Sequence, residues 1–256
     1  MRIVIKVGTS SLTHETGRLN IRKMEQFVKV LSDVKNAGHE IILVSSGAIA
    51  MGVGKLNLPG RPKDLPGKQA AAAVGQCELM YTYDKMFTEY HHTVAQILLT
   101  SEDVEDEDRK KNFENTLNTL LSMGVLPIIN ENDTVATREI TLGDNDTLGG
   151  IVAVSSKADL LVLLSDIDGL YDSDPHKHPD AKLYSEIREI TPEIEAIAGG
   201  AGTNRGTGGM VTKLHAAKTV MSAGIDMIIM NSDRPEALYD VLSGAFTGTR
   251  FLGRKA

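Results

Sequence analysis

The sequence predicts an α/β fold, a three-layer αβα sandwich with a mainly parallel central sheet, and two observations predict it. Stretches with apolar residues at helical spacing close on a glycine or alanine, and a short apolar strand begins almost at once. These strands are near-continuous runs of Val, Ile and Leu without alternation, which is typical of parallel strands covered on both faces. The repeated order of helix and then strand indicates a sheet connected by right-handed crossovers.

The elements follow in order along the chain. A strand is expected in the run IVIKVG, from residue 3 to residue 8. Apolar residues at helical spacing predict a helix over 22–38, with Gly38 as its C-cap, and the strand EIILVSSG follows. A helical stretch is expected at 70–87 and a strand at 93–99. Three more helix and strand pairs are expected at 108–124 with 125–130, 147–158 with 159–166, and 209–224 with 225–231.

Composition narrows the class of protein. Hydrophobic residues make up 41% and charged residues 24%, as in a soluble globular protein, and no apolar run is long enough to span a bilayer. The N-terminus lacks the apolar core and cleavage site of a signal peptide, so we expect a cytoplasmic protein. With a net charge of −7, no tryptophan and 4% aromatic residues, the chain offers neither a basic surface nor a stacking platform for nucleic acid. The single cysteine, Cys77, has no disulfide partner and is expected to pack in the interior.

The chain length of 256 residues fits one large domain or two small ones. No Pro-rich or Gly-rich linker divides it. We therefore expect a single domain over 1–256, with two lobes that share one sheet, about 1–155 and about 156–256. Each strand ends in small or polar residues, and in open α/β sheets ligands bind beyond the carboxyl ends of the strands.

Lys6 is the most informative residue of the first strand. It has apolar neighbours on both sides, and burial of an unpaired ammonium costs several kcal/mol. Something anionic is therefore expected to meet it. Gly8 and the small residues that follow leave backbone N–H groups free to face an anion, and phosphate is the natural candidate.

The glycine-rich run GTGGMVTK, from Gly206 to Lys213, is neither a P-loop nor a Rossmann fingerprint, because its spacing fits neither motif. It is a glycine loop that leads into a helix N-terminus, with Lys213 in the first turns of that helix. Such a helix start suits a polyphosphate, and the alternative is a mobile surface loop.

Two polar clusters, NEND at 130–133 and GDND at 143–146, flank one loop after a buried strand. Asn and Asp form turns in many loops, but two such clusters favour a site for a small polar ligand. Asp146 is the acidic residue placed most naturally to hold both lysines. The segment LLSDIDGLYDSDP carries four aspartates without the spacing of a calcium loop, and we interpret it as a nucleotide-facing loop with solvated aspartates.

Taken together, KVGTS, VSSGAIAMG, INENDTVAT, GDNDTL, LLSDIDGLYDSDP and GTGGMVTK resemble the amino acid kinase superfamily, most closely its members that phosphorylate free glutamate. The resemblance covers nearly the whole chain in the right order. It implies an amino-acid-binding lobe followed by an ATP-binding lobe, with ATP and Mg²⁺ as cofactors. It also implies the reaction, in which L-glutamate and ATP give γ-glutamyl phosphate and ADP at the start of proline synthesis.

The resemblance also implies a role for each matching residue. Lys6 and Lys213 would flank the transferred phosphoryl group, and Asp146 would orient them. Glutamate would bind at Ser46, Gly47, Asp133 and Asn145. The nucleotide would bind at Lys6, Gly8, Ser165, Asp166, Thr207, Gly208, Gly209, Met210, Val211, Thr212 and Lys213. No direct protein ligand of the metal is assigned.

Several expectations and alternatives remain at this stage. The chain stops at Ala256, so we expect the kinase domain without the C-terminal PUA domain that many members of the family carry. Feedback inhibition by proline and assembly into a dimer or tetramer are further expectations. The alternatives are a kinase of the same superfamily acting on acetylglutamate, aspartate, carbamate or UMP, and a non-catalytic amino acid sensor that kept the fold.

Overall fold

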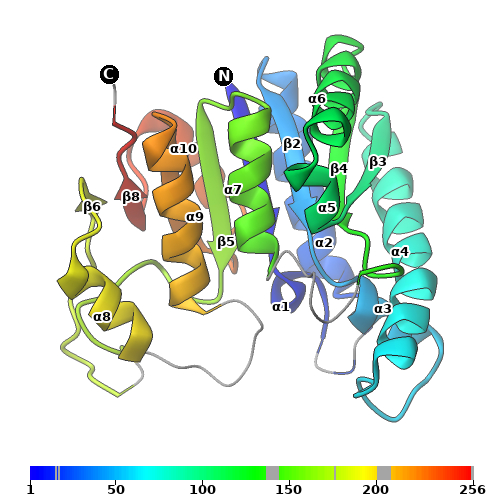
Figure 1. The fold of residues 1–256 in the computed structure, drawn as a ribbon, viewed down its shortest axis with the longest axis horizontal. Helices are drawn as coiled ribbons and strands as arrows, with labels where there is room; N and C mark the ends of the chain where they lie inside the picture. Colours follow the sequence, from blue (N-terminus) through cyan, green and yellow to red (C-terminus); the bar gives the residue numbers. More distant parts are fainter. Residues whose placement is uncertain (15, 17, 137–143, 176, 201–208, 255–256) are drawn as a thin grey trace. The chain divides into compact units, whose positions relative to one another are not determined.

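The structure, a computed structural model, describes residues 1–14, 16, 18–136, 144–175, 177–200 and 209–254 (Figure 1). The chain forms two compact units, which we call the N-terminal unit (residues 7–142) and the C-terminal unit (residues 1–6 and 143–256). Strand β1 (Arg2–Val7) therefore lies almost entirely in the C-terminal unit. Whether the two units correspond to an amino-acid-binding lobe and an ATP-binding lobe stays a prediction.

The C-terminal unit is a sheet with helices on both faces. Its strands lie in the order β1, β5 (Leu160–Ser165), β7 (Asp226–Asn231), β8 (Thr249–Phe251), β6 (Glu186–Ile187). β5 and β7 are parallel, with Leu160 opposite Asp226 and Ser165 opposite Asn231. β8 runs antiparallel to β7 and parallel to β6. The polar ends of β5 and β7 are therefore neighbours.

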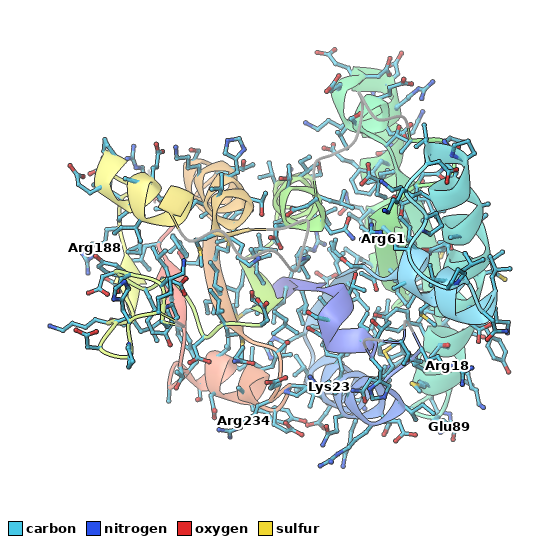
Figure 2. All side chains as sticks on the ribbon, turned by 90° about the horizontal axis from the view of Figure 1, so that it is seen from below. Arg18, Lys23, Arg61, Glu89, Arg188 and Arg234 are labelled. Carbon is cyan, nitrogen blue, oxygen red and sulfur yellow. The ribbon has the colours of Figure 1, made fainter. Side chains whose placement is uncertain are left out.

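The helices of this unit are α7 (Asn145–Ser155), α8 (Pro192–Gly200), α9 (Met210–Ser222) and α10 (Ala237–Ser243). α7 and α9 pack side by side over one face of the sheet, and α10 lies behind the other face (Figure 1). The β5 strand LLVLLS is buried along its whole length, as expected for a strand covered on both sides. At the surface, Arg188 forms an ion pair with Glu186 of the short strand β6 (Arg188 is labelled in Figure 2).

The described residues of the N-terminal unit form three strands in the order β3 (Val94–Leu99), β4 (Leu126–Glu131), β2 (Glu40–Ser45), and both pairings are parallel. Its helices are α1 (Thr9–Leu12), α2 (Ile21–Asn36), α3 (Ala48–Lys55), α4 (Leu65–Thr88), α5 (Ser101–Glu105) and α6 (Glu107–Ser122). α6 covers β4 on one face, and α2 lies against β2 on the other (Figure 1). The predicted α/β class with a mainly parallel sheet is confirmed.

Helices α3 and α4 approach so closely that only glycine fits at two positions. A Cβ added to Gly75 would lie 1.7 Å from the carbonyl oxygen of Ala48, and one added to Gly52 would lie 1.8 Å from that of Ala71. This contact holds the start of α3, which directly follows the end of β2. Cys77 lies away from it and is exposed, so the expectation that it packs in the interior is wrong. The helix turns its Gly75 and Leu79 side toward the protein instead.

Within the described part of the chain, no helix is both long enough and apolar enough to cross a bilayer.

Candidate active site

The buried carboxylate of Asp146 binds two lysines in the C-terminal unit. Nζ of Lys6 on β1 lies 2.6 Å from Oδ1 of Asp146, and Nζ of Lys213 on α9 lies 2.9 Å from Oδ2. Thr212 adds a hydrogen bond of 3.2 Å from its hydroxyl to the same Oδ2. The anion that meets Lys6 in this structure is therefore a carboxylate of the chain itself, and Asp146 holds the two ammonium groups close to one another.

The cluster of Lys6, Asp146 and Lys213 has two positive charges and one negative charge and is almost completely shielded from solvent. Asp146 is fully buried, and the residues Lys6 and Lys213 are only 7% and 6% exposed. Burial raises the pKa of the Asp146 carboxyl, but the ammonium groups of Lys6 and Lys213 outweigh it and hold that pKa below its ordinary value. Asp146 is therefore ionised at neutral pH. The cluster thus joins two ammonium groups to one ionised carboxylate.

The sequence dictates the position of Asp146 through a helix start. Asp144 is the N-cap of α7, and its Oδ1 accepts hydrogen bonds from the backbone N–H groups of Asp146 (2.7 Å) and Thr147 (3.2 Å). Asn145, the first residue of α7, is half-buried. Oδ2 of Asp144 is buried without a hydrogen-bond partner among the described residues. We did not predict a role for Asp144, although an aspartate at the start of a helical stretch is itself an N-cap signal.

A cavity opens beside Lys213 within the C-terminal unit. Its lining includes Ser165 and Asp166 after β5, Gly209 and Met210 at the start of α9, and Lys213. Gly209 is the N-cap of α9, so this helix start carries backbone N–H groups and the positive end of the helix dipole. Ser165 donates a hydrogen bond of 3.1 Å to Asp166.

The cavity lining therefore brings together five of the residues predicted to bind nucleotide, and two more, Lys6 and Thr212, meet Lys213 at Asp146. Of the other predicted residues, Val211 is half exposed on α9, and Gly8 is the N-cap of α1 in the N-terminal unit. Thr207 and Gly208 lie outside the described residues. The binding role of all these residues stays a prediction.

In the N-terminal unit, the residues after β2 form a sharp turn into α3. Gly47 has a φ of 103°, a left-handed conformation that glycine adopts without strain, and it is the N-cap of α3. The strand end is fixed by a hydrogen bond of 2.9 Å between Ser45 and the buried hydroxyl of Tyr83 on α4. Burial raises the pKa of Tyr83 far above its ordinary value, so its proton stays in place. Ser46 and Gly47 are both half-buried at this turn.

Asp133 follows β4 in the same unit. Burial raises the pKa of its carboxyl above the ordinary value, and the positive charge of Arg61 opposes that shift (Arg61 is labelled in Figure 2). The preceding strand end is fixed by a chain of side-chain amides. Asn130 donates a hydrogen bond of 2.9 Å to Gln76 on α4, which donates one of 3.0 Å to Gln96 on β3. Sequence reasoning missed this chain, because its members come from three separate elements.

The donor set of the described residues bears on the expected Mg²⁺. No group of three or more His, Cys, Asp or Glu side chains among them is placed to hold a metal ion. Both carboxylate oxygens of Asp146 form ion pairs with lysines. Mg²⁺ in phosphoryl-transfer sites usually keeps several waters and binds through substrate phosphates with one or two carboxylates. The residues present fit that mode of binding, in which the protein supplies few ligands.

Comparison with known proteins identifies the family of this chain. Residues 1–231 match the family described as "Amino acid kinase family". The chain belongs to the amino acid kinase family. It is 55% identical to a glutamate 5-kinase of Clostridium perfringens over 99% of this chain and 96% of that protein. It is also 55% identical to a glutamate 5-kinase of Carboxydothermus hydrogenoformans, over 99% of this chain and 68% of that protein.

Solved structures of other family members share the fold at low sequence identity. A carbamate kinase from Giardia lamblia bound to AMP-PNP matches with a TM-score of 0.70 and 18% identity, over 99% of this chain and 98% of that chain. A UMP kinase from Ureaplasma parvum matches with a TM-score of 0.66 and 15% identity, over 98% of each chain. At such identities the likeness establishes the amino acid kinase fold alone.

Proposed function

We propose that this protein phosphorylates the γ-carboxylate of L-glutamate with ATP, giving L-glutamyl 5-phosphate and ADP, the reaction that opens proline synthesis. The observation that carries the proposal is the Lys6–Asp146–Lys213 cluster, a buried excess of positive charge beside a cavity that ends on a helix N-terminus. Relatives named glutamate 5-kinase, 52% to 55% identical over nearly the whole chain, support the choice of substrate.

The residues present suit phosphoryl transfer to a carboxylate. A γ-carboxylate has an ordinary pKa of about 4.3 and is ionised at neutral pH, so no general base is needed. One of its oxygens attacks the γ-phosphorus of ATP, the bond from that phosphorus to the bridging oxygen breaks, and ADP leaves with the electron pair. Negative charge is spread over the equatorial oxygens in the transition state, and fixed cations stabilise it. Lys6 and Lys213 would provide these cations.

The other proposed roles are those of nucleotide binding and glutamate binding. Ser165, Asp166 and the start of α9 would bind the nucleotide, with the helix N-terminus toward its phosphates. Ser46, Gly47 and Asp133 of the N-terminal unit and Asn145 of the C-terminal unit would bind glutamate. A carboxylate such as Asp133 suits the α-ammonium group of an amino acid.

Mg²⁺ belongs to the same proposal, and when bound with ATP it would neutralise charge on the phosphates. Asp166 and Asp174, which both line the cavity, would be available as carboxylate ligands for it. Inhibition by proline and assembly into a homodimer or homotetramer are also proposed, and they are properties to be measured in the purified protein.

The experiment that tests the proposal is trapping of the acyl phosphate with hydroxylamine in the presence of Mg-ATP. L-Glutamate, N-acetyl-L-glutamate and L-aspartate are compared in parallel, and hydroxamate is expected from L-glutamate. Hydroxamate from another acid would show that the protein is a kinase but that its substrate is that acid. If no acid gave hydroxamate in a folded protein that binds ATP, the proposal would be wrong, and an amino acid sensor would take its place.

A further inference from the structure

The loop after β5 forms one wall of the cavity in the C-terminal unit. The lining includes Ile167, Gly169, Leu170, Tyr171 and Ser173. Because this loop has no helical or strand hydrogen bonds of its own along most of its length, its shape depends on the contacts that it makes with other elements. Those contacts come from a side chain within the loop and from the ends of two strands.

Asp168 is the side chain that connects the loop to the sheet. Its Oδ2 accepts a hydrogen bond of 3.0 Å from the hydroxyl of Tyr171, three residues further along the loop. Its Oδ1 accepts one of 2.9 Å from the side-chain amide of Asn231, the last residue of β7. The sequence led us to expect solvated aspartates here, and for Asp168 that expectation is wrong, since it is half-buried and both of its carboxylate oxygens accept hydrogen bonds.

The state of Tyr171 is consistent with this arrangement. Burial, with the hydrogen bond to Asp168 and its negative charge, raises the pKa of Tyr171 above the ordinary value. The hydroxyl therefore keeps its proton and donates a hydrogen bond to the carboxylate. Hydrogen bonds to a charged acceptor are about twice as strong as those between neutral groups, so this contact restrains the Tyr171 ring.

The backbone of the same loop is held by Thr249 on β8. Its Oγ1 accepts a hydrogen bond of 2.8 Å from the Leu170 N–H and donates one of 2.6 Å to the carbonyl of Tyr184. Thr249 is fully buried, and a Cβ added to Gly169 would lie 2.4 Å from its Oγ1. The loop backbone is thus packed tightly against β8, so the Asp168 contacts decide where the Tyr171 side chain lies.

We propose that Asp168 is a positioning residue for the nucleotide, because its carboxylate ties Tyr171 of the cavity wall to Asn231 at the end of β7. Asp168 does not line the cavity and would act only through Tyr171 and the loop backbone. This inference rests on the proposed function, since it takes the cavity to be the nucleotide site.

The test compares Asp168→Asn, Tyr171→Phe and the double variant with the wild-type protein. Asp180→Asn is the matched control, because it makes the same chemical change at an exposed residue of the same unit. Three quantities are measured for each protein: the dissociation constant of Mg-ADP by calorimetry, the separate KM values for ATP and glutamate, and the melting temperature. The amide of Asp168→Asn can accept only one of the two hydrogen bonds, so we expect nucleotide binding to weaken about 5- to 30-fold.

The expected pattern is a rise in the Mg-ADP dissociation constant and in KM for ATP, with KM for glutamate and the melting temperature nearly unchanged. The double variant should weaken Mg-ADP binding by less than the sum of the two single changes, since both act on the Asp168–Tyr171 contact. Unchanged nucleotide binding in Asp168→Asn would overturn the inference, and so would a general loss of stability with both KM values raised together. If the wild-type protein failed to bind Mg-ADP, the proposed nucleotide site itself would be wrong.

Discussion

Replacing Asp146 with asparagine should destabilise the protein strongly, because the change removes the buried carboxylate that both buried ammonium groups contact. At 2.6 and 2.9 Å the carboxylate attracts each lysine by roughly 6 kcal/mol at an effective dielectric constant of about 20. We therefore expect the free energy of unfolding to fall by about 3–5 kcal/mol, the usual cost of breaking a buried pair.

The assay is urea denaturation at pH 7, followed by circular dichroism, for the wild-type protein, Asp146→Asn and the double variant Asp146→Asn with Lys213→Met. The double variant should recover part of the lost free energy, since only one of the two buried ammonium groups remains. Asp180→Asn serves as the control and should stay within about 0.5 kcal/mol of the wild type. A fall of less than 1 kcal/mol for Asp146→Asn, or a double variant less stable than the single one, would refute the account of the cluster.

Three further predictions concern packing, binding and pH. Gly75→Ala should lower the free energy of unfolding by about 1–3 kcal/mol, because the new methyl group would overlap the Ala48 carbonyl oxygen. Gly60→Ala is the control in the same denaturation assay and should be nearly neutral, because Gly60 has open space around it. Asp133→Asn should raise KM for glutamate about tenfold or more and leave KM for ATP near its wild-type value in steady-state kinetics, since one charged hydrogen bond is lost; equal effects on both would contradict its placement. Because the folded-state pKa of Asp146 is lowered, its contribution to the free energy of unfolding is complete above the unfolded-state pKa of 3.8 and is lost as the pH falls through the folded-state pKa. Acid titration of the wild type should therefore show a loss of stability below about pH 4 that Asp146→Asn lacks.

The main elements of the fold could be predicted because their signals are local. Apolar periodicity and the glycine stops located α2, α6, α7 and α9 with the strands that follow them. The short elements α1, α3, α5, α8, α10, β6 and β8 were not predicted, since these helices have only four to nine residues and these strands two or three, which carry little periodicity. Cys77 shows a second limit of sequence-based prediction, which is the choice of the buried face of a helix. Helix α4 is apolar on several sides, and its sequence does not indicate which side faces α3.

Some residues of the candidate site could likewise be predicted from the sequence, and others could not. A lysine inside an apolar strand signals its own need for an anion, and therefore Lys6 could be singled out from the sequence. Asp168 could not, because its partner Asn231 lies 63 residues away and nothing local distinguishes it from the exposed Asp172 of the same loop. The amide chain that begins at Gln76 is equally hidden, since it bonds to Asn130 across 54 residues.

The central claim is that the lysine pair held by Asp146 stabilises the transferred phosphoryl group. The most direct measurement is kcat for hydroxamate formation from L-glutamate by Lys213→Ala, with Mg-ADP binding and the melting temperature measured on the same protein. Loss of one charge-stabilising donor typically costs about 10² to 10³ in rate, so we expect kcat to fall at least that far in a folded protein that still binds nucleotide. Wild-type turnover by a folded Lys213→Ala variant would contradict the claim.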